Sequence, residues 1–288
     1  MPEPASFELE VPGASLTYDV RPSSTAAAPV LLMVGSPMGA SGFGTLAGYF
    51  PDRTVVTYDP RGVERSRRTD DATVSTPKEH ADDLRRLIEV VGGAPVDVFA
   101  SSGGAVNALV LVARHSELVR TLVAHEPPAA DALPDRAEVI AACEAIHATY
   151  EHDGFGPAMA RFMALVSHQG LVPARWAETT APDPAAFGLP TTDDGTRDDP
   201  LLGQNIVTSV SHVHDFTALK AASTRIVIGV GVASEGELAH RAGEAVAARL
   251  GSAPLRFPSH HGGFLGGEYG QVGEPEAFAA TLRAALKD

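Results

Sequence analysis

The stretch that decides the fold covers residues 96–104 and reads Val-Asp-Val-Phe-Ala-Ser-Ser-Gly-Gly. Its first five residues form an apolar run typical of a buried strand, and a helical pattern follows the glycines. Where a sharp strand-to-helix turn exposes a nucleophile, the residues two before and two after it must be small. Ala100 and Gly104 satisfy this rule around Ser102, whereas a turn centred on Ser101 would crowd a phenylalanine. The stretch predicts a nucleophilic Ser102; the alternative is a glycine-softened turn with a serine cap.

Further apolar runs indicate other strands around this one. Two alternating runs, Phe7–Val11 and Ser15–Val20, flank a Pro-Gly pair and predict an antiparallel hairpin at a sheet edge. Continuous runs are typical of parallel strands that are covered on both faces. These runs are Pro29–Val34, Thr54–Asp59, Val96–Ala100, Val119–His125 and Arg225–Val230, and a short strand is expected at Leu255–Phe257.

Helical patterns lie between several of these strands. The clearest begins at Thr76, where Pro77 and Glu79 complete a capping box with proline at the first helical position, and it stops at Gly92-Gly93. Strand–helix alternation of this kind predicts an α/β fold.

The strand signal disappears between residues 129 and 222, which predicts a helical insert between core segments 1–128 and 223–288. Apolar residues recur there at helical spacing, and we expect them to be buried. The two stripes are Val139, Cys143, Ile146 and Tyr150, and Met159, Phe162, Met163 and Val166.

A second candidate for chemistry lies near the C-terminus, where residues 259–264 read Ser-His-His-Gly-Gly-Phe. A serine hydroxyl attacks slowly unless a base removes its proton, and imidazole is suited to that role near neutral pH. His260 or His261 could supply this base; the alternative for either is an ordinary histidine in a surface loop.

The turn after the run Pro29–Val34 is a candidate oxyanion site. It reads Gly35-Ser36-Pro37, and Ser36 has a backbone N–H that proline lacks. This N–H and that of Gly103 could hold a developing oxyanion, and the alternative is a plain strand-to-helix loop.

Composition restricts the partners of the chain. Its 288 residues hold 22 basic and 36 acidic side chains, a formal charge of −14 that disfavours nucleic acid. The single cysteine, Cys143, fits a reducing compartment. Because no secretion signal or membrane-length apolar run is visible, we expect a cytoplasmic protein that acts on a small molecule; oligomeric state stays open.

Two other motifs are discounted. Gly229-Val230-Gly231 lacks the third glycine of a dinucleotide fingerprint, and the metal-like run His212-Val213-His214-Asp215 has no further ligand cluster. No metal or cofactor is therefore expected.

Together these motifs resemble the α/β-hydrolase superfamily over nearly the whole chain. Ser102 resembles the nucleophile elbow, residues 59–62 (Asp-Pro-Arg-Gly) resemble the loop after the fourth strand, and residues 261–264 resemble the histidine loop. The resemblance implies an eight-stranded, mostly parallel sheet flanked by helices, with a helical cap, here residues 129–222, inserted after the sixth strand. It also implies that His261 is the base.

The family's acid is not evident, because Ala233 stands near its usual place after the seventh strand. Glu126 directly follows the strand Val119–His125 and keeps the order Ser, acid, His, as does Glu235. Glu235 lies two residues beyond Ala233, and the loop would have to bend to bring it to the expected position, so Glu126 is favoured. The absence of an acid is the third possibility.

The function predicted is that of a serine hydrolase acting through an acyl-enzyme on an ester, lactone, thioester or amide of a small molecule. Ser102, His261 and Glu126 would form the triad, with Ser36 and Gly103 as oxyanion donors. The alternative is a non-hydrolytic binder or isomerase on the same fold, for which the missing acid at Ala233 is the main argument.

Overall fold

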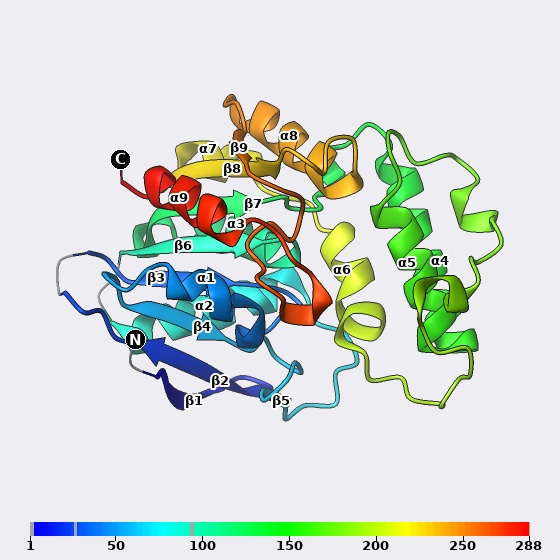
Figure 1. Ribbon diagram of the computed structural model, residues 1–288, viewed down its shortest axis with the longest axis horizontal. Coiled ribbons are helices and arrows are strands. Elements are labelled where there is room, and N and C mark those ends of the chain that lie inside the picture. The colour runs from blue at the N-terminus through cyan, green and yellow to red at the C-terminus, as the bar shows by residue number, and fades with distance from the viewer. Residues whose placement is uncertain (1–2, 26–27, 93–94, 288) are drawn as a thin grey trace.

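A mostly parallel sheet forms the centre of the molecule (Figure 1). The computed structural model describes residues 3–25, 28–92 and 95–287. Within them eight strands lie in the order β1-β2-β4-β3-β6-β7-β8-β9, and a ninth, the two-residue β5, pairs with β2. The bounds are β1 (Ala5–Val11), β2 (Ala14–Arg21), β3 (Leu31–Val34), β4 (Val55–Tyr58), β5 (Arg67–Arg68), β6 (Val96–Ser101), β7 (Val119–His125), β8 (Arg225–Gly231) and β9 (Leu255–Phe257). The predicted α/β sheet is confirmed, including its antiparallel β1–β2 hairpin.

Helices cover both faces of this sheet, as its continuous apolar strands require. One face packs against α1 (Gly44–Gly48) and α9 (Pro275–Ala285). The other face packs against α2 (Pro77–Val91), α3 (Gly103–Arg114), α7 (Phe216–Ala221) and α8 (Leu238–Leu250).

The start of α2 follows directly from its sequence. The Thr76 hydroxyl accepts the Glu79 N–H at 3.3 Å, and the Glu79 carboxylate accepts the Thr76 N–H at 2.9 Å, so both arms of the capping box form. The helix ends at Val91 and is capped by Gly92, whose φ of 70° suits glycine. Gly93, the second glycine of the stop signal, lies outside the described residues.

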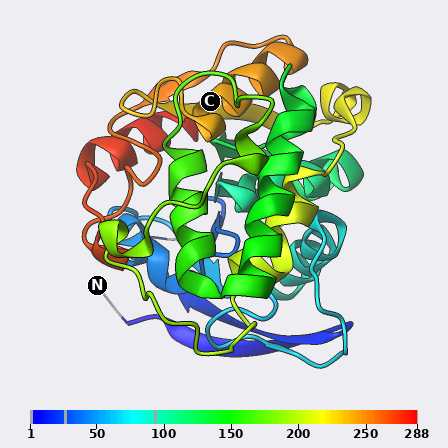
Figure 2. The same cartoon turned by 90° about the vertical axis from the view of Figure 1, so that its right-hand side faces the viewer.

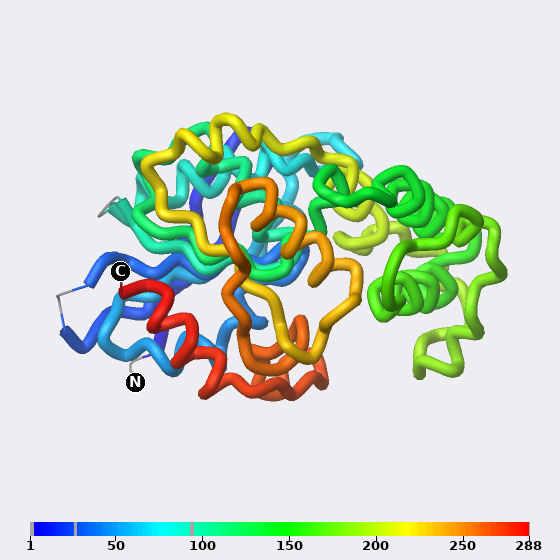
Figure 3. Tube along the Cα trace, turned by 90° about the horizontal axis from the view of Figure 1, so that it is seen from above, coloured from blue at the N-terminus to red at the C-terminus, as the bar shows by residue number. Residues whose placement is uncertain are grey.

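The segment after β7 builds a separate helical layer at the carboxyl ends of the strands (Figures 1 and 3). It contains α4 (Arg136–Asp153), α5 (Phe155–Val166) and α6 (Ile206–Val210), and α4 and α5 stand side by side in Figure 2. Its last helix, α7, packs against α3 of the core, although the sequence analysis counted it with the insert. Short helical turns complete the chain: η1 (Ala40–Phe43), η2 (Ser116–Leu118), η3 (Ala130–Ala132), η4 (Trp176–Glu178), η5 (Pro184–Phe187), η6 (Pro200–Asn205) and η7 (Glu268–Gly270).

The two predicted apolar stripes behave differently. All four stripe residues of α4 are buried. On α5 the expectation is wrong, because Met163 is 38% exposed and the other three stripe residues are only partly buried. The buried face of α5 consists mostly of small residues, including Gly156, Ala158 and Ala160, and α4 is its main partner. Small side chains let two helices approach closely, which leaves the longer side chains on a more open flank.

No helix in the described part of the chain is long and apolar enough to cross a bilayer.

Candidate active site

The turn from β6 to α3 has the strained geometry expected of a nucleophile elbow. Ser102 adopts φ 57° and ψ −130°, a conformation that costs a non-glycine residue about 1–3 kcal/mol. The Ser102 N–H donates to the carbonyl of His125 at 3.0 Å, which ties the turn to the end of the neighbouring strand β7. Ser101 is buried, with its hydroxyl 3.4 Å from Nδ1 of His125. The strained backbone position therefore belongs to Ser102 and not to Ser101.

The glycines after Ser102 are needed because the loop after β3 lies against them. A Cβ at Gly103 would lie 2.5 Å from the carbonyl oxygen of Ser36, and one at Gly104 would lie 2.5 Å from that of Val34. Both distances are far inside van der Waals contact. The two loops that the sequence analysis named as oxyanion donors are thus direct neighbours, and Gly103 opens a helix whose first N–H groups lack intrahelical partners.

Asp59 anchors the loop after β3, which carries the candidate oxyanion donor Ser36. Its carboxylate accepts the Ala40 N–H at 2.8 Å and the Nε–H of Arg65 at 2.6 Å. Two residues on, Arg61 makes a paired contact with the carboxylate of Asp83, at 2.8 and 2.7 Å. The sequence indicated the Asp-Pro-Arg-Gly motif only by its family resemblance, and it did not predict that Asp59 positions the chain at Ala40.

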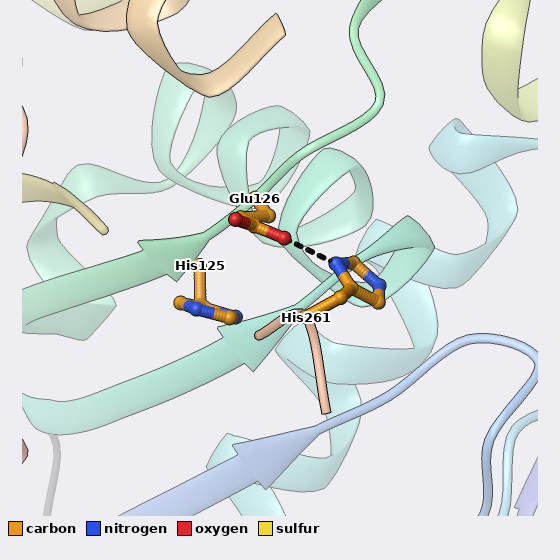
Figure 4. A group of neighbouring side chains, drawn as sticks. All are labelled: His125, Glu126 and His261. Atoms are coloured by element: carbon orange, nitrogen blue, oxygen red, sulfur yellow. Dashed lines mark hydrogen bonds and ion pairs between the residues drawn. The ribbon is translucent and has the colours of Figure 1, made fainter. Parts of the chain in front are cut away.

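Glu126 contacts His261 at the carboxyl ends of the strands (Figure 4). The imidazole Nδ1–H donates to Oε2 of Glu126 at 2.6 Å, across 135 positions of sequence. Glu126 has φ 47° and is fully buried, and its N–H donates to the carbonyl of Gly229 on β8 at 2.9 Å. Adjacent strands therefore carry the candidate nucleophile and this acid.

The Glu126 carboxyl is ionised. Burial favours its neutral form, but the hydrogen bond and charge of His261 outweigh burial and lower the pKa of Glu126 to about 2. An ionised carboxylate only accepts hydrogen bonds, so the neutral form of His261 carries its proton on Nδ1 and its lone pair on Nε2. That is the tautomer a general base needs when it takes a proton from serine.

The neighbouring His260 is held in a different way. Its Nδ1 accepts the Gly262 N–H at 3.0 Å, and its Nε2 lies 3.4 Å from the carbonyl of Val272. His261, by contrast, keeps 39% of its side chain exposed while bound to Glu126. The structure thus separates two histidines that were equivalent by residue type.

Other candidates of the sequence analysis lie elsewhere. Glu235 is exposed, and Gly229-Val230-Gly231 is the end of strand β8. His214 donates from both its backbone N–H and Nδ1 to the carboxylate of Asp131, at 2.8 and 2.9 Å, which anchors the chain before α7 to the loop after β7.

The potential ligand atoms of His125, Glu126 and His261 all lie within 4.8 Å of one another. Two donors bound to one tetrahedral zinc ion lie roughly 3 Å or more apart, given metal–ligand bonds of about 2.0–2.2 Å. The 2.6 Å separation between Glu126 and His261 is that of a hydrogen bond, so this pair does not fit a shared metal ion.

Two residues near Glu126 were not predicted from the sequence. Ser234 and His240 are both fully buried beside the acid, from the loop after β8 and from α8. Ser234 directly follows Ala233, where the resemblance placed the missing acid, and that position was the one signal that could have drawn attention to it.

The chain matches the family model described as alpha/beta hydrolase fold over residues 29–143. An enol-lactonase from Burkholderia xenovorans LB400 has a similar structure, with a TM-score of 0.67 over 98% of this chain and 100% of that one, at 15% identity. The chain adopts the α/β-hydrolase fold.

A second solved structure and a curated protein are also similar to this chain. A thermophilic esterase from Thermogutta terrifontis superposes with a TM-score of 0.65 over 99% of this chain and all of that one, at 17% identity. The uncharacterized hydrolase YraK of Bacillus subtilis is 40% identical over 121 residues, which is 41% of this chain and 43% of that protein. The match thus spans less than half the length of this curated relative.

Proposed function

We propose that this protein is a serine hydrolase that cleaves an ester, lactone, thioester or amide of a small organic molecule. The observation that carries the proposal is the hydrogen bond between the buried Glu126 carboxylate and Nδ1 of His261, at the end of the strand next to the elbow that presents Ser102. Relatives described as an enol-lactonase and an esterase support the choice of substrate class.

In the proposed mechanism His261 Nε2 takes the proton of the Ser102 hydroxyl as the oxygen attacks the substrate carbonyl. Glu126 stabilises the imidazolium that forms and keeps the ring oriented. The backbone N–H groups of Ser36 and Gly103 hold the negative charge on the former carbonyl oxygen. The imidazolium then protonates the leaving group, and water, activated by the same ring, releases the acyl group from Ser102.

The alternative of a non-hydrolytic binder or isomerase rested on the missing acid at Ala233. The contact of Glu126 with His261 removes the need for an acid at that position.

An active-site fluorophosphonate tests the proposal, because it labels an activated serine and not a passive one. We expect stoichiometric labelling of the native chain at Ser102 and none in Ser102→Ala. Ser101→Ala, in the buried neighbouring position, is the matched control and should still react. Labelling that survives Ser102→Ala, or a native chain that does not react, would contradict the proposed function.

A further inference from the structure

The loop Gly231–Ser234, here called the β8 loop, contacts both the acid and the histidine segment although it contributes no carboxylate to them. The Gly231 N–H donates to Oε1 of Glu126 at 2.8 Å, and the Ser234 hydroxyl bonds to the same oxygen. The Ala233 N–H donates at 2.9 Å to the carbonyl of Ser259, two residues before His261. One short loop therefore joins the two partners of the proposed proton relay.

The two carboxylate oxygens of Glu126 bind different partners. Oε2 faces His261, while Oε1 is occupied by the two donors of the β8 loop. Because the carboxylate is ionised, the Ser234 hydroxyl must be the donor in its contact. With both ends occupied, the carboxylate cannot rotate about its last bond without breaking a charge-assisted hydrogen bond.

Burial makes these contacts costly to lose. Glu126 and Ser234 are both 0% exposed, so water cannot replace a missing donor without a rearrangement of the loop. A hydrogen bond to a charged group contributes more than a neutral one.

The surroundings also immobilise the β8 loop. The buried His240 has Nδ1 2.9 Å from the carbonyl of Gly231, which can only accept, so Nδ1 is the donor. A Cβ at Gly231 would lie 2.8 Å from the Ser234 hydroxyl and 2.9 Å from the Ser259 carbonyl. Glycine is required there because the histidine segment and the β8 loop touch directly.

We propose that Ser234 is a positioning residue, which fixes the Glu126 carboxylate by its Oε1 so that Oε2 holds His261 in the orientation for proton transfer. This inference rests on the proposed function and deepens it. The resemblance located the acid near Ala233. The next residue, Ser234, instead donates a hydrogen bond to Glu126, which follows the neighbouring strand β7.

The test compares Ser234→Ala with the native chain in steady-state hydrolysis of p-nitrophenyl acetate. We expect kcat to fall about tenfold, the loss of one charge-assisted hydrogen bond, while KM changes less than about twofold. The acid limb of the kcat/KM profile, which reports protonation of the proposed general base, should shift in Ser234→Ala, because a carboxylate that has lost a donor interacts differently with the imidazolium. Ser75→Ala is the matched control: Ser75 is equally buried, but its hydroxyl accepts from Arg68 at 2.7 Å, and this variant should change neither kcat nor the profile.

A double-mutant cycle separates positioning from a general structural role. If Ser234 acts through Glu126, Ser234→Ala should cost almost nothing further in a Glu126→Gln background. An equal fold-loss in both backgrounds, or an unchanged kcat and pH profile in Ser234→Ala, would overturn the inference. Ser234→Cys, which keeps a weak donor of similar size, should be intermediate between serine and alanine; activity no better than that of Ser234→Ala would also count against it.

The same series distinguishes the two proposals. Activity that remains in Ser102→Ala defeats the proposed function itself. An inactive Ser102→Ala beside a fully active Ser234→Ala defeats the inference alone. The downfield proton resonance of the His261 Nδ1–H gives a readout independent of turnover, and it should shift in Ser234→Ala and not in Ser75→Ala.

Discussion

Among the described residues, five other than glycine adopt left-handed backbone angles, and three of these lie in loops of the candidate site. They are Ser102, Glu126 and Ser259, which stand in the elbow, at the acid and just before the histidines. Each such residue costs about 1–3 kcal/mol, so it persists only where its surroundings hold it. Here the N–H groups of Ser102 and Glu126 each donate to a neighbouring strand, which holds the turns in place.

At the residue scale, Glu126→Gln should keep the fold and lower kcat by roughly 10²–10⁴. A neutral amide cannot stabilise the imidazolium, and it can hold His261 in the wrong tautomer. Ester hydrolysis measured beside circular dichroism checks this result. The control is Glu235→Gln, an exposed position that should retain full activity. The reverse outcome would move the acid to the β8 side of the site.

The two adjacent histidines give a second prediction at this scale. His261→Ala should reduce kcat by roughly 10³–10⁶, the range for loss of a residue of a triad, because His261 is the one histidine of the described residues that hydrogen-bonds Glu126 Oε2. His260→Ala should remain within about tenfold of the native chain, since the hydrogen bonds of its ring go to backbone groups of Gly262 and Val272. Parallel kinetics on the two variants decide the matter, and comparable losses would leave His261 without a distinct role.

At the scale of elements, the site depends on how closely the elbow of β6 and α3 approaches the loop after β3. Gly104→Ala would bring a Cβ within 2.5 Å of the Val34 carbonyl, a backbone atom that cannot swing away. We expect a loss of about 1–3 kcal/mol in unfolding free energy, which is typical of overpacking. Turnover should also fall, because the added methyl group would push Ser102 away from the loop after β3 that carries Ser36.

Gly44→Ala is the matched control for this substitution. Gly44 opens α1 with ordinary helical angles, and an added Cβ would meet only Glu268, at 3.6 Å. Urea unfolding should show no loss of stability for this variant. A Gly104→Ala chain as stable as Gly44→Ala would mean that the two loops are not in tight contact.

At the scale of the whole molecule, two fully buried histidines make stability dependent on pH. Burial lowers the pKa of His80 and of His125 to about 4, from an ordinary 6.5. Between these pH values the unfolded chain binds more protons than the folded one, so stability is complete above about pH 6.5 and falls as the pH drops toward 4. Each residue should contribute on the order of 1–2 kcal/mol to the loss at about pH 5.

Urea unfolding near pH 7 and pH 5 measures this effect. His125→Phe, which keeps an apolar ring in the aromatic cluster around Phe257 and Phe278, should reduce the acid-induced loss by its own share, on the order of 1–2 kcal/mol at about pH 5. His152→Gln, at an exposed position of α4, should leave the loss unchanged. An unaltered loss in His125→Phe would show that this ring is not the source.

Much of the architecture follows from local patterns. Strands Val119–His125 and Leu255–Phe257 coincide with their apolar runs, and the capping box at Thr76 begins α2 as expected. The Ser102 register follows from the size rule for a crowded turn. These features depend on residues within a few positions of one another, so periodicity, capping and steric limits suffice to predict them.

Contacts between segments far apart in the sequence could not be predicted from local patterns, and they are known from the folded structure alone. Glu126 and Glu235 both kept the required order, and the pairing of β7 with β8 brings Glu126 to the histidine loop while Glu235 is left exposed. The buried face of α5 depends on the close approach of α4, which its own spacing does not encode. Ser234 has no distinguishing local pattern, since its significance arises only when a carboxylate 108 positions away is buried against it. Local sequence determines the elements and the turn of the candidate nucleophile, whereas the partners of a buried charge depend on which loops the packed sheet brings together.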